Sequence, residues 1–140
     1  MVAIELSQVT KSYKRTDVLK GADLKINEGT FTVIFGGPAS GKSVLQRMIV
    51  GLEKPDSGTI YIRGQDSTRV IPSERNIGYV PQSFALYPHY TVYDNIAYPL
   101  VLAGVAKASI KPVVEEAASL LKITHLLSKK PDQLSGGEKQ

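Results

Sequence analysis

The chain of 140 residues is long enough for one domain with its own hydrophobic core. Hydrophobic residues make up 42% and charged residues 21% of the sequence, the usual balance of a globular protein. The sequence contains no cysteine, which excludes a disulfide framework and a thiolate metal site. The net charge of +4 comes from scattered Lys and Arg residues, so we expect a solvated basic surface and no nucleic-acid partner.

The sequence shows neither a secretion-signal pattern at its N-terminus nor a membrane-spanning stretch. The longest mostly apolar stretch, residues 97–106, is much shorter than the roughly 20 residues that a membrane helix needs. We therefore expect any link to a membrane to come through a partner protein.

Most predicted strands lie in the first 80 residues or so. Alternating apolar residues predict an edge strand at the N-terminus, with Val2, Ile4 and Leu6 on one face. Residues 18–26 predict a second strand, in which Gly21 marks a bulge. The run Phe-Thr-Val-Ile-Phe at 31–35 is typical of a strand buried on both faces of a parallel sheet. A turn at 55–58 precedes two further predicted strands, 59–63 and 77–80.

Helical patterns begin after a glycine-rich loop and dominate from Tyr90 onward. Apolar residues at i, i+3 and i+4 predict one helix face made of Val44, Leu45, Met48, Ile49 and Leu52. Thr91 is the predicted N-cap of a second helix. A later helix is predicted to bury Val113, Val114, Ala117, Leu120 and Leu121. This order predicts a single α/β domain, β-rich over about 1–87 and helical over about 88–134.

Residues 36–43, Gly-Gly-Pro-Ala-Ser-Gly-Lys-Ser, match the phosphate-binding pattern G-x-x-x-x-G-K-[ST]. Glycines let consecutive backbone N–H groups turn toward phosphate oxygens, and the helix that starts near Lys42 directs its positive end at the same anion. Lys42 adds a full charge, and the Ser43 hydroxyl is a hard oxygen ligand suited to Mg²⁺. The alternative is a glycine-rich turn with an incidental lysine, but a strand before the loop and a helix after it favour a nucleotide site.

Further motifs surround this loop in a characteristic order. Leu-Ser-Gly-Gly-Glu occupies 134–138, Gln82 lies within the segment 79–89, and Val-Thr-Lys-Ser-Tyr ends at Tyr13. Together they resemble the signature sequence, the Q-loop and the adenine-stacking aromatic of ATP-binding-cassette (ABC) transporter ATPases. Segments 51–58 and 85–96 look like the ATPases of bacterial carbohydrate importers of the maltose and glycerol-phosphate type.

This resemblance implies an α/β P-loop fold with N-terminal antiparallel strands and a helical subdomain. It implies that ATP is bound by Tyr13, Gly36, Gly37, Pro38, Ala39, Ser40, Gly41, Lys42, Ser43, Val44 and Gln82. Tyr13 would stack on adenine, while Ser43 and Gln82 would approach Mg²⁺. The signature residues would instead contact ATP held by a second ATPase subunit, in a homo- or heterodimer: Ser135, Gly136, Gly137 and Glu138.

The resemblance also implies partners in the membrane. Residues 86–94 would face transmembrane permease subunits, which act with a solute-binding protein. The chain would then work at the cytoplasmic face of the inner membrane, bound through those permeases.

Certain positions depart from the family's pattern. Ala39 stands where glycine is frequent, and a positive φ there would cost alanine about 1–2 kcal/mol. Pro81 replaces an aromatic residue before Gln82, and Glu138 replaces the signature glutamine.

The family's hydrolysis residues are expected beyond the signature: an aspartate for Mg²⁺, a glutamate for the attacking water, and a switch histidine. No apolar run followed by Asp-Glu occurs in the sequence, and His89 and His125 both precede the signature. We therefore expect the chain to end before the Walker B strand, to contain no catalytic residue of its own, and to be inactive alone.

Other functions are less compatible with these motifs. A P-loop kinase or GTPase would not explain Gln82 and residues 134–138, and an ABC protein acting on DNA or ribosomes would not explain residues 85–96. A remnant that binds nucleotide without hydrolysing it stays open for the 140-residue chain.

Overall fold

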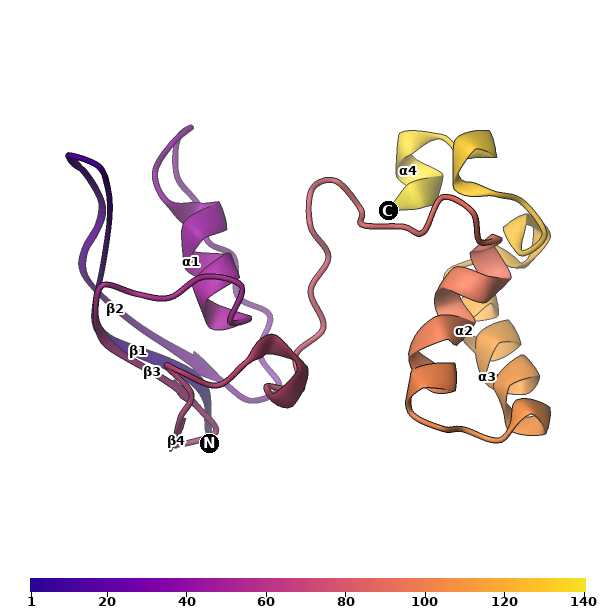
Figure 1. The fold of residues 1–140 in the computed structure, drawn as a ribbon, viewed down its shortest axis with the longest axis horizontal. Helices are drawn as coiled ribbons and strands as arrows, with labels where there is room; N and C mark the ends of the chain where they lie inside the picture. The colour runs from indigo at the N-terminus through magenta and orange to yellow at the C-terminus, as the bar shows by residue number, and fades with distance from the viewer. The chain divides into compact units, whose positions relative to one another are not determined.

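The computed structural model describes all residues from 1 to 140, which divide into two compact units, residues 1–79 and 80–140. The first unit contains a β-sheet and one α-helix, and the second contains the remaining α-helices (Figure 1). The single domain expected from the sequence stays a prediction. No helix in either unit combines the length and the apolar character that crossing a membrane requires.

A four-stranded antiparallel sheet forms the base of the first unit. Its strands are β1 (Val2–Tyr13), β2 (Thr16–Asn27), β3 (Ser57–Ile62) and β4 (Gln65–Asp66), in the order β2-β1-β3-β4. The predicted edge position of the first strand is wrong, because β1 pairs with β2 on one side and β3 on the other. Alternating apolar residues report that one face of a strand is buried, and they carry no information about how many neighbours it has.

Two irregularities interrupt the pairing of β1 with its neighbours, one with β2 and one with β3. The predicted bulge at Gly21 is confirmed by its φ of +71° and by a register shift in the β1–β2 ladder between Val9 and Lys11. A second irregularity places Gln8 at a φ of +49° against Gly58, whose φ is +85°. A Cβ atom on Gly58 would lie 2.3 Å from the Gln8 carbonyl oxygen, so only glycine fits where β3 crosses β1.

The helix α1 (Lys42–Ile49) packs its apolar side against the sheet and forms the core of the first unit. Every member of this core is buried: Leu6, Val9, Leu45, Met48, Ile49 and Ile60. The predicted helix face is therefore confirmed for its central residues, whereas Leu52 lies beyond the helix and is half exposed. Burial of each large apolar side chain contributes about 1.5–3 kcal/mol and holds α1 on the sheet.

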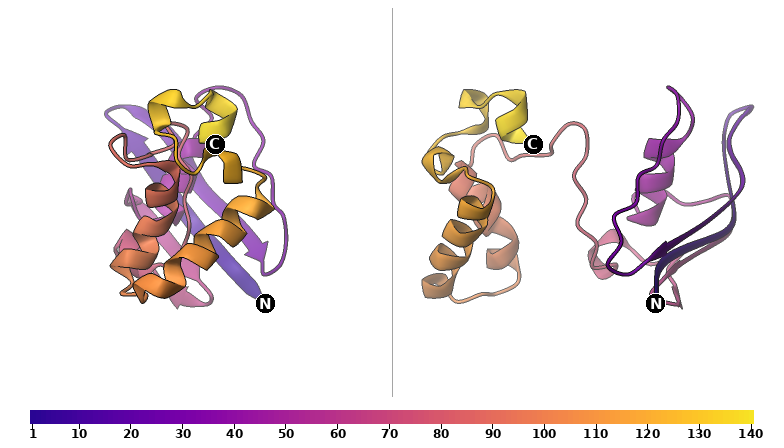
Figure 2. Two further views of the ribbon diagram at one scale, coloured as in Figure 1. Left: turned by 90° about the vertical axis from the view of Figure 1, so that its right-hand side faces the viewer. Right: turned by 180° about the vertical axis from the view of Figure 1, so that it is seen from behind.

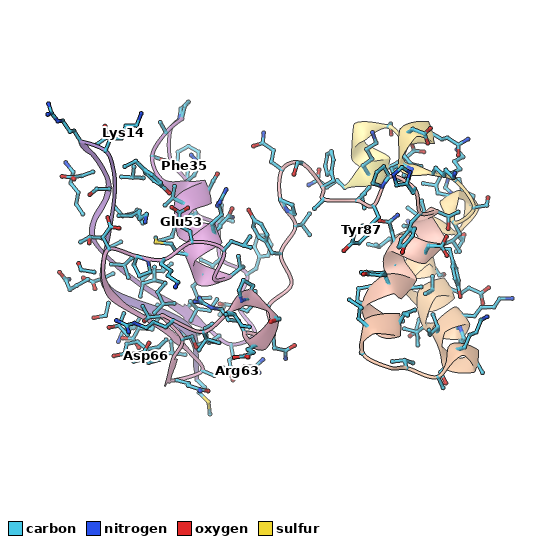
Figure 3. The ribbon with its side chains drawn as sticks, in the orientation of Figure 1. Lys14, Phe35, Glu53, Arg63, Asp66 and Tyr87 are labelled. Carbon is cyan, nitrogen blue, oxygen red and sulfur yellow. The ribbon has the colours of Figure 1, made fainter.

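Two predicted strands are absent from the sheet. Residues 31–35 and 77–80 form no ladder, and Phe31 and Phe35 are 94% and 97% exposed (Phe35 is labelled in Figure 3). A strand persists only when a neighbouring strand pairs with its N–H and C=O groups, and no strand in the structure runs beside these segments. Their composition favours a strand but cannot supply the missing pairing.

The second unit consists of α2 (Val92–Leu102), α3 (Lys107–Leu120) and the short α4 (Gly136–Lys139), with 3-10 turns at Thr124–Leu126 and Pro131–Gln133. A further 3-10 turn, Pro72–Glu74, belongs to the first unit. Figure 2 shows α2 and α3 lying against one another. The predicted N-cap is confirmed, because the Thr91 hydroxyl accepts a hydrogen bond from the Asp94 N–H at 3.1 Å.

The predicted apolar face of the later helix is only partly correct. Val114 is fully buried, but Val113, Leu120 and Leu121 are exposed. The residues that α3 buries are instead Ile110, Val114 and Ala118. These residues recur every four positions, so α3 presents a narrow stripe to its neighbour rather than a broad face.

Candidate nucleotide-binding site

The glycine-rich loop leads into the amino end of α1, and its backbone conformation departs from the ordinary at two positions. Ala39 has a φ of +60° and Gly41 a φ of +86°. A Cβ on Gly41 would lie 3.0–3.2 Å from atoms of Val18 and Leu19, so glycine is needed for space as well as for φ. A positive φ was considered for residue 39 from the sequence, and Ala39 adopts one.

The ammonium group of Lys42 folds back onto this loop. It donates hydrogen bonds to the carbonyl oxygens of Gly36 and Gly37, each at 2.7 Å, and to the Ser40 hydroxyl at 3.2 Å. A Cβ on Gly36 would lie 2.7 Å from that same Ser40 oxygen. Glycine at 36 thus keeps the loop tight around a half-buried positive charge.

The first turn of α1 offers backbone donors and a hydroxyl group. Its N-cap is Gly41, no side chain caps the free N–H groups, and the turn contains no acidic residue. The unpaired N–H groups and the helix dipole together favour an anion at this end. Ser43 stands exposed in this turn, whereas Val44 packs on the core and can contribute only its backbone N–H. Pro38 has no N–H and can only shape the loop.

Tyr13, the last residue of β1, is held by its hydroxyl group. The hydroxyl donates a hydrogen bond to the carboxylate of Glu53, a residue labelled in Figure 3. This bond, aided by partial desolvation, raises the pKa of Tyr13, so the phenol stays protonated. Lys11 Nζ lies 5.5 Å from the ring centroid on the aromatic face.

Glu53 is the centre of a charged group that joins the end of β1 to the segment after α1. Its carboxylate lies 3.7 Å from Lys11 Nζ and 3.5 Å from Arg47 Nε, and its side chain is only 15% exposed. Asp56 extends the link by accepting a 2.7 Å bond from the Ser12 N–H. That bond, followed by the one from Lys11, lowers the pKa of Asp56. Sequence reasoning missed Glu53, because a surface carboxylate has no local pattern that predicts such a long-range contact.

Gln82 belongs to the second unit, whereas the phosphate loop belongs to the first. It is exposed in a turn closed by a 2.9 Å bond from the Phe84 N–H to the Pro81 carbonyl. Phe84 and Ala85 both have positive φ, so the chain reverses sharply just after Gln82. Its predicted approach to Mg²⁺ stays a prediction.

The signature residues form the start of α4. The Ser135 hydroxyl and N–H donate to the Glu138 carboxylate at 2.7 and 2.8 Å, which completes a capping box. These bonds lower the pKa of Glu138, with the Ser135 N–H the larger cause. Gly136 and Gly137 are exposed, and Leu134 anchors the segment in the core. The capping box shows that glutamate is compatible with this position, because its carboxylate accepts both bonds as a glutamine amide oxygen could.

Comparison with known proteins agrees with these motifs. The family model described as "ABC transporter" matches residues 19–140. The chain is 45% identical to the sn-glycerol-3-phosphate import ATP-binding protein UgpC of Pectobacterium atrosepticum and 46% identical to the maltose/maltodextrin import ATP-binding protein MalK of Vibrio parahaemolyticus. Both alignments cover the whole chain but only 40% and 38% of the relatives, so the chain spans less than half their length.

A solved structure has the same fold. It is the dimeric structure of a post-hydrolysis state of the ATP-binding cassette MJ0796 bound to ADP and Pi, 31% identical in sequence, with a TM-score of 0.87. The match covers 97% of this chain and 65% of that one. The α/β ABC ATPase fold expected from the sequence is therefore confirmed. With the family model matching most of its residues, the chain belongs to the ABC transporter family.

Proposed function

We propose that this chain is part of the ATP-binding subunit of an ABC importer for carbohydrate or glycerol phosphate. Its role would be to bind MgATP and to pass the effects of binding and hydrolysis to membrane partners. The relatives named above are import ATP-binding proteins, and the identity of 45–46% over the whole chain supports a related role. Hydrolysis itself is a proposal for the protein of which these residues are a part.

The observation that carries the proposal is the position of Lys42. Its charge is held inside the loop by two carbonyl oxygens, at the amino end of a helix whose first N–H groups have no side-chain cap. A triphosphate is the ligand that matches a concentrated positive charge, free backbone donors and a helix dipole. Binding would exchange the Lys42–carbonyl bonds, wholly or in part, for charge-assisted bonds to phosphate.

The donor set also fits Mg²⁺. Ser43 places a hydroxyl oxygen in the first turn of α1, and Gln82 would add an amide oxygen; both are hard ligands that Mg²⁺ accepts. When bound, the ion neutralises charge on the β- and γ-phosphates. Tyr13 would offer adenine the aromatic surface that Glu53 holds in place.

We further propose that ATP joins two such subunits. Ser135, Gly136 and Gly137 are exposed, as contact with a nucleotide on another subunit requires. Residues 86–94 would face permease subunits at the cytoplasmic side of the membrane, with a solute-binding protein acting through them. The solved relative with this fold is itself described as dimeric.

The test is a calorimetric titration of the chain with MgATP. Lys42→Ala removes the held charge, and Lys20→Ala is the matched control because Lys20 is an exposed residue of β2. We expect Lys42→Ala to weaken binding at least about tenfold, since a hydrogen bond to a charged group is worth about 1.5–3 kcal/mol. Lys20→Ala should bind as the parent does. Equal affinity of all three proteins would remove the assignment.

A further inference from the structure

Arg75 is a buried charge that the nucleotide site described above does not use. The residue is 6% exposed, and none of the ion pairs in the chain includes it. Burial lowers the pKa of its guanidinium, but arginine stays protonated in proteins. A buried charge without a counter-ion is costly unless its hydrogen bonds are well placed, so the partners of Arg75 explain why it is there.

Those partners are backbone carbonyls, two at the carboxyl end of α1 and one in the segment before Arg75. Nη1 donates to the carbonyl oxygens of Met48 and Ile49, both at 2.8 Å, and Nε donates to Val70 at 2.9 Å. The last carbonyls of a helix have no partner within the helix and form the negative end of its dipole. Arg75 therefore binds the Ile49 carbonyl, shares the Met48 carbonyl with the Gly51 N–H, and places a full positive charge at the end of α1.

Gly51 provides the space for this contact. It has a φ of +82° just after α1, where helices commonly end on a glycine. A Cβ at this position would lie 2.6 Å from Arg75 Nε and 2.9 Å from the Cζ atom. Gly51 therefore suits Arg75 in two ways: it adopts the positive φ that ends α1, and it has no side chain to clash with the guanidinium.

The same helix carries the phosphate-binding residues at its other end. With eight residues α1 is about 12 Å long, so a small tilt at its carboxyl end moves Lys42 and Ser43. The apolar contacts of Leu45 and Met48 hold α1 on the sheet but are not directional. The hydrogen bonds from Arg75 are directional, and they fix the helix against the segment that contains Val70.

We propose that Arg75 is a positioning residue for the phosphate loop: from the carboxyl end of α1 it sets the orientation in which Lys42 and Ser43 meet the nucleotide. The inference rests on the proposed function for its nucleotide, but the contact itself is independent of that function. The proposal predicts that Arg75, although distant from the phosphate, affects the affinity for MgATP.

The experiment compares Arg75→Ala with Arg69→Ala in the 140-residue chain. Arg69 lies in the same segment and is exposed, so its removal costs the same charge without the contact. We expect Arg75→Ala to weaken MgATP binding about tenfold and to speed amide exchange in α1, with Arg69→Ala unchanged in both. Guanidinium ion at a low, non-denaturing concentration should restore binding by Arg75→Ala, whereas urea of the same shape but no charge should not. Parental affinity in Arg75→Ala would overturn the proposal.

A double-mutant cycle isolates the steric match. Gly51→Ala carries the same φ penalty with or without Arg75, so the cycle cancels that penalty and leaves the clash with the guanidinium. We expect Gly51→Ala to weaken MgATP binding strongly in the parent and much less in Arg75→Ala. An equal loss in both backgrounds would show that the two residues do not act together, and would overturn the proposal.

Two outcomes would change which measurement decides the inference: the parent chain could fail to bind MgATP, or Arg75→Ala could fail to fold. If the parent chain binds no MgATP, the proposed function fails, and exchange of the α1 amides alone decides the inference: faster exchange in Arg75→Ala supports it and unchanged exchange overturns it. If Arg75→Ala does not fold, Arg75→Lys takes its place. An ammonium group is too compact to bond Val70 and the α1 carbonyls at once, so weaker MgATP binding supports the inference and parental binding overturns it.

Discussion

The backbone conformation of Ala39 in the phosphate loop can be tested by its effect on the stability of the chain. With a φ of +60°, this alanine occupies the left-handed region that costs a residue with a Cβ about 1–2 kcal/mol. Ala39→Gly removes that strain from the folded state. The same change gives the unfolded chain more freedom, which costs about 0.4–1 kcal/mol. The difference predicts a net stabilisation of about 0.5–1 kcal/mol, or a rise in Tm of about 2–4 °C.

The control is an alanine with an ordinary φ. Ala103 is exposed at the end of α2 with a φ of −75°, so Ala103→Gly has only the unfolded-state cost and should lower stability. Ala85, with a φ of +52°, should respond like Ala39. Denaturant and thermal unfolding of the three variants measure the difference. A loss of stability in Ala39→Gly as large as that in Ala103→Gly would refute the reasoning.

Two further predictions concern the remaining parts of the site. Tyr13→Ala should weaken MgATP binding by about 1–3 kcal/mol, which is the free energy of stacking an aromatic ring on a base. Tyr13→Trp and Tyr13→Phe keep an aromatic ring and should retain the affinity measured by calorimetric titration. Equal affinities for all the variants would rule out stacking. The pKa of Glu138 is lowered in the folded chain, so its capping bonds stabilise the start of α4 fully when the pH is above the ordinary pKa of 4.5. That stabilisation is lost as the pH falls through the lower folded-state pKa. NMR titration of the Glu138 carboxyl should show this pKa rising part of the way to its ordinary value in Ser135→Ala, which keeps the N–H donor, and an unchanged pKa would contradict the capping box.

Features that depend on neighbours in the chain were predictable. The Thr91 cap needs only Asp94 three residues later, and the Gly21 bulge needs only a residue that tolerates positive φ. The phosphate loop is likewise a local pattern: Gly41 adopts a positive φ and Lys42 folds back onto the loop, while its contact with phosphate stays a prediction. Local hydrogen bonds and backbone preferences decide these features, and the sequence displays both.

Features that depend on distant segments were not predictable. Whether β1 is central or at an edge depends on β3, which lies some 50 residues away, and residues 31–35 lack a partner that their own composition cannot supply. Glu53 and Arg75 became visible only through contacts with Tyr13 and with the end of α1. A charged side chain that is buried by distant backbone looks, in the sequence, like any other surface charge.

The central place of β1 also sets the order in which the chain can fold during synthesis. The hairpin of β1 and β2 is complete once residue 27 has emerged, but Ile4 pairs with Ile62, 58 residues later. At about 5–20 residues per second, one side of β1 waits roughly 3–12 s for its partner strand. During that interval the nascent chain exposes an unpaired strand edge, which chaperones would protect. In the second unit the start of α2 waits as well, because the Val92 N–H bonds to the Lys129 carbonyl oxygen, 37 residues later.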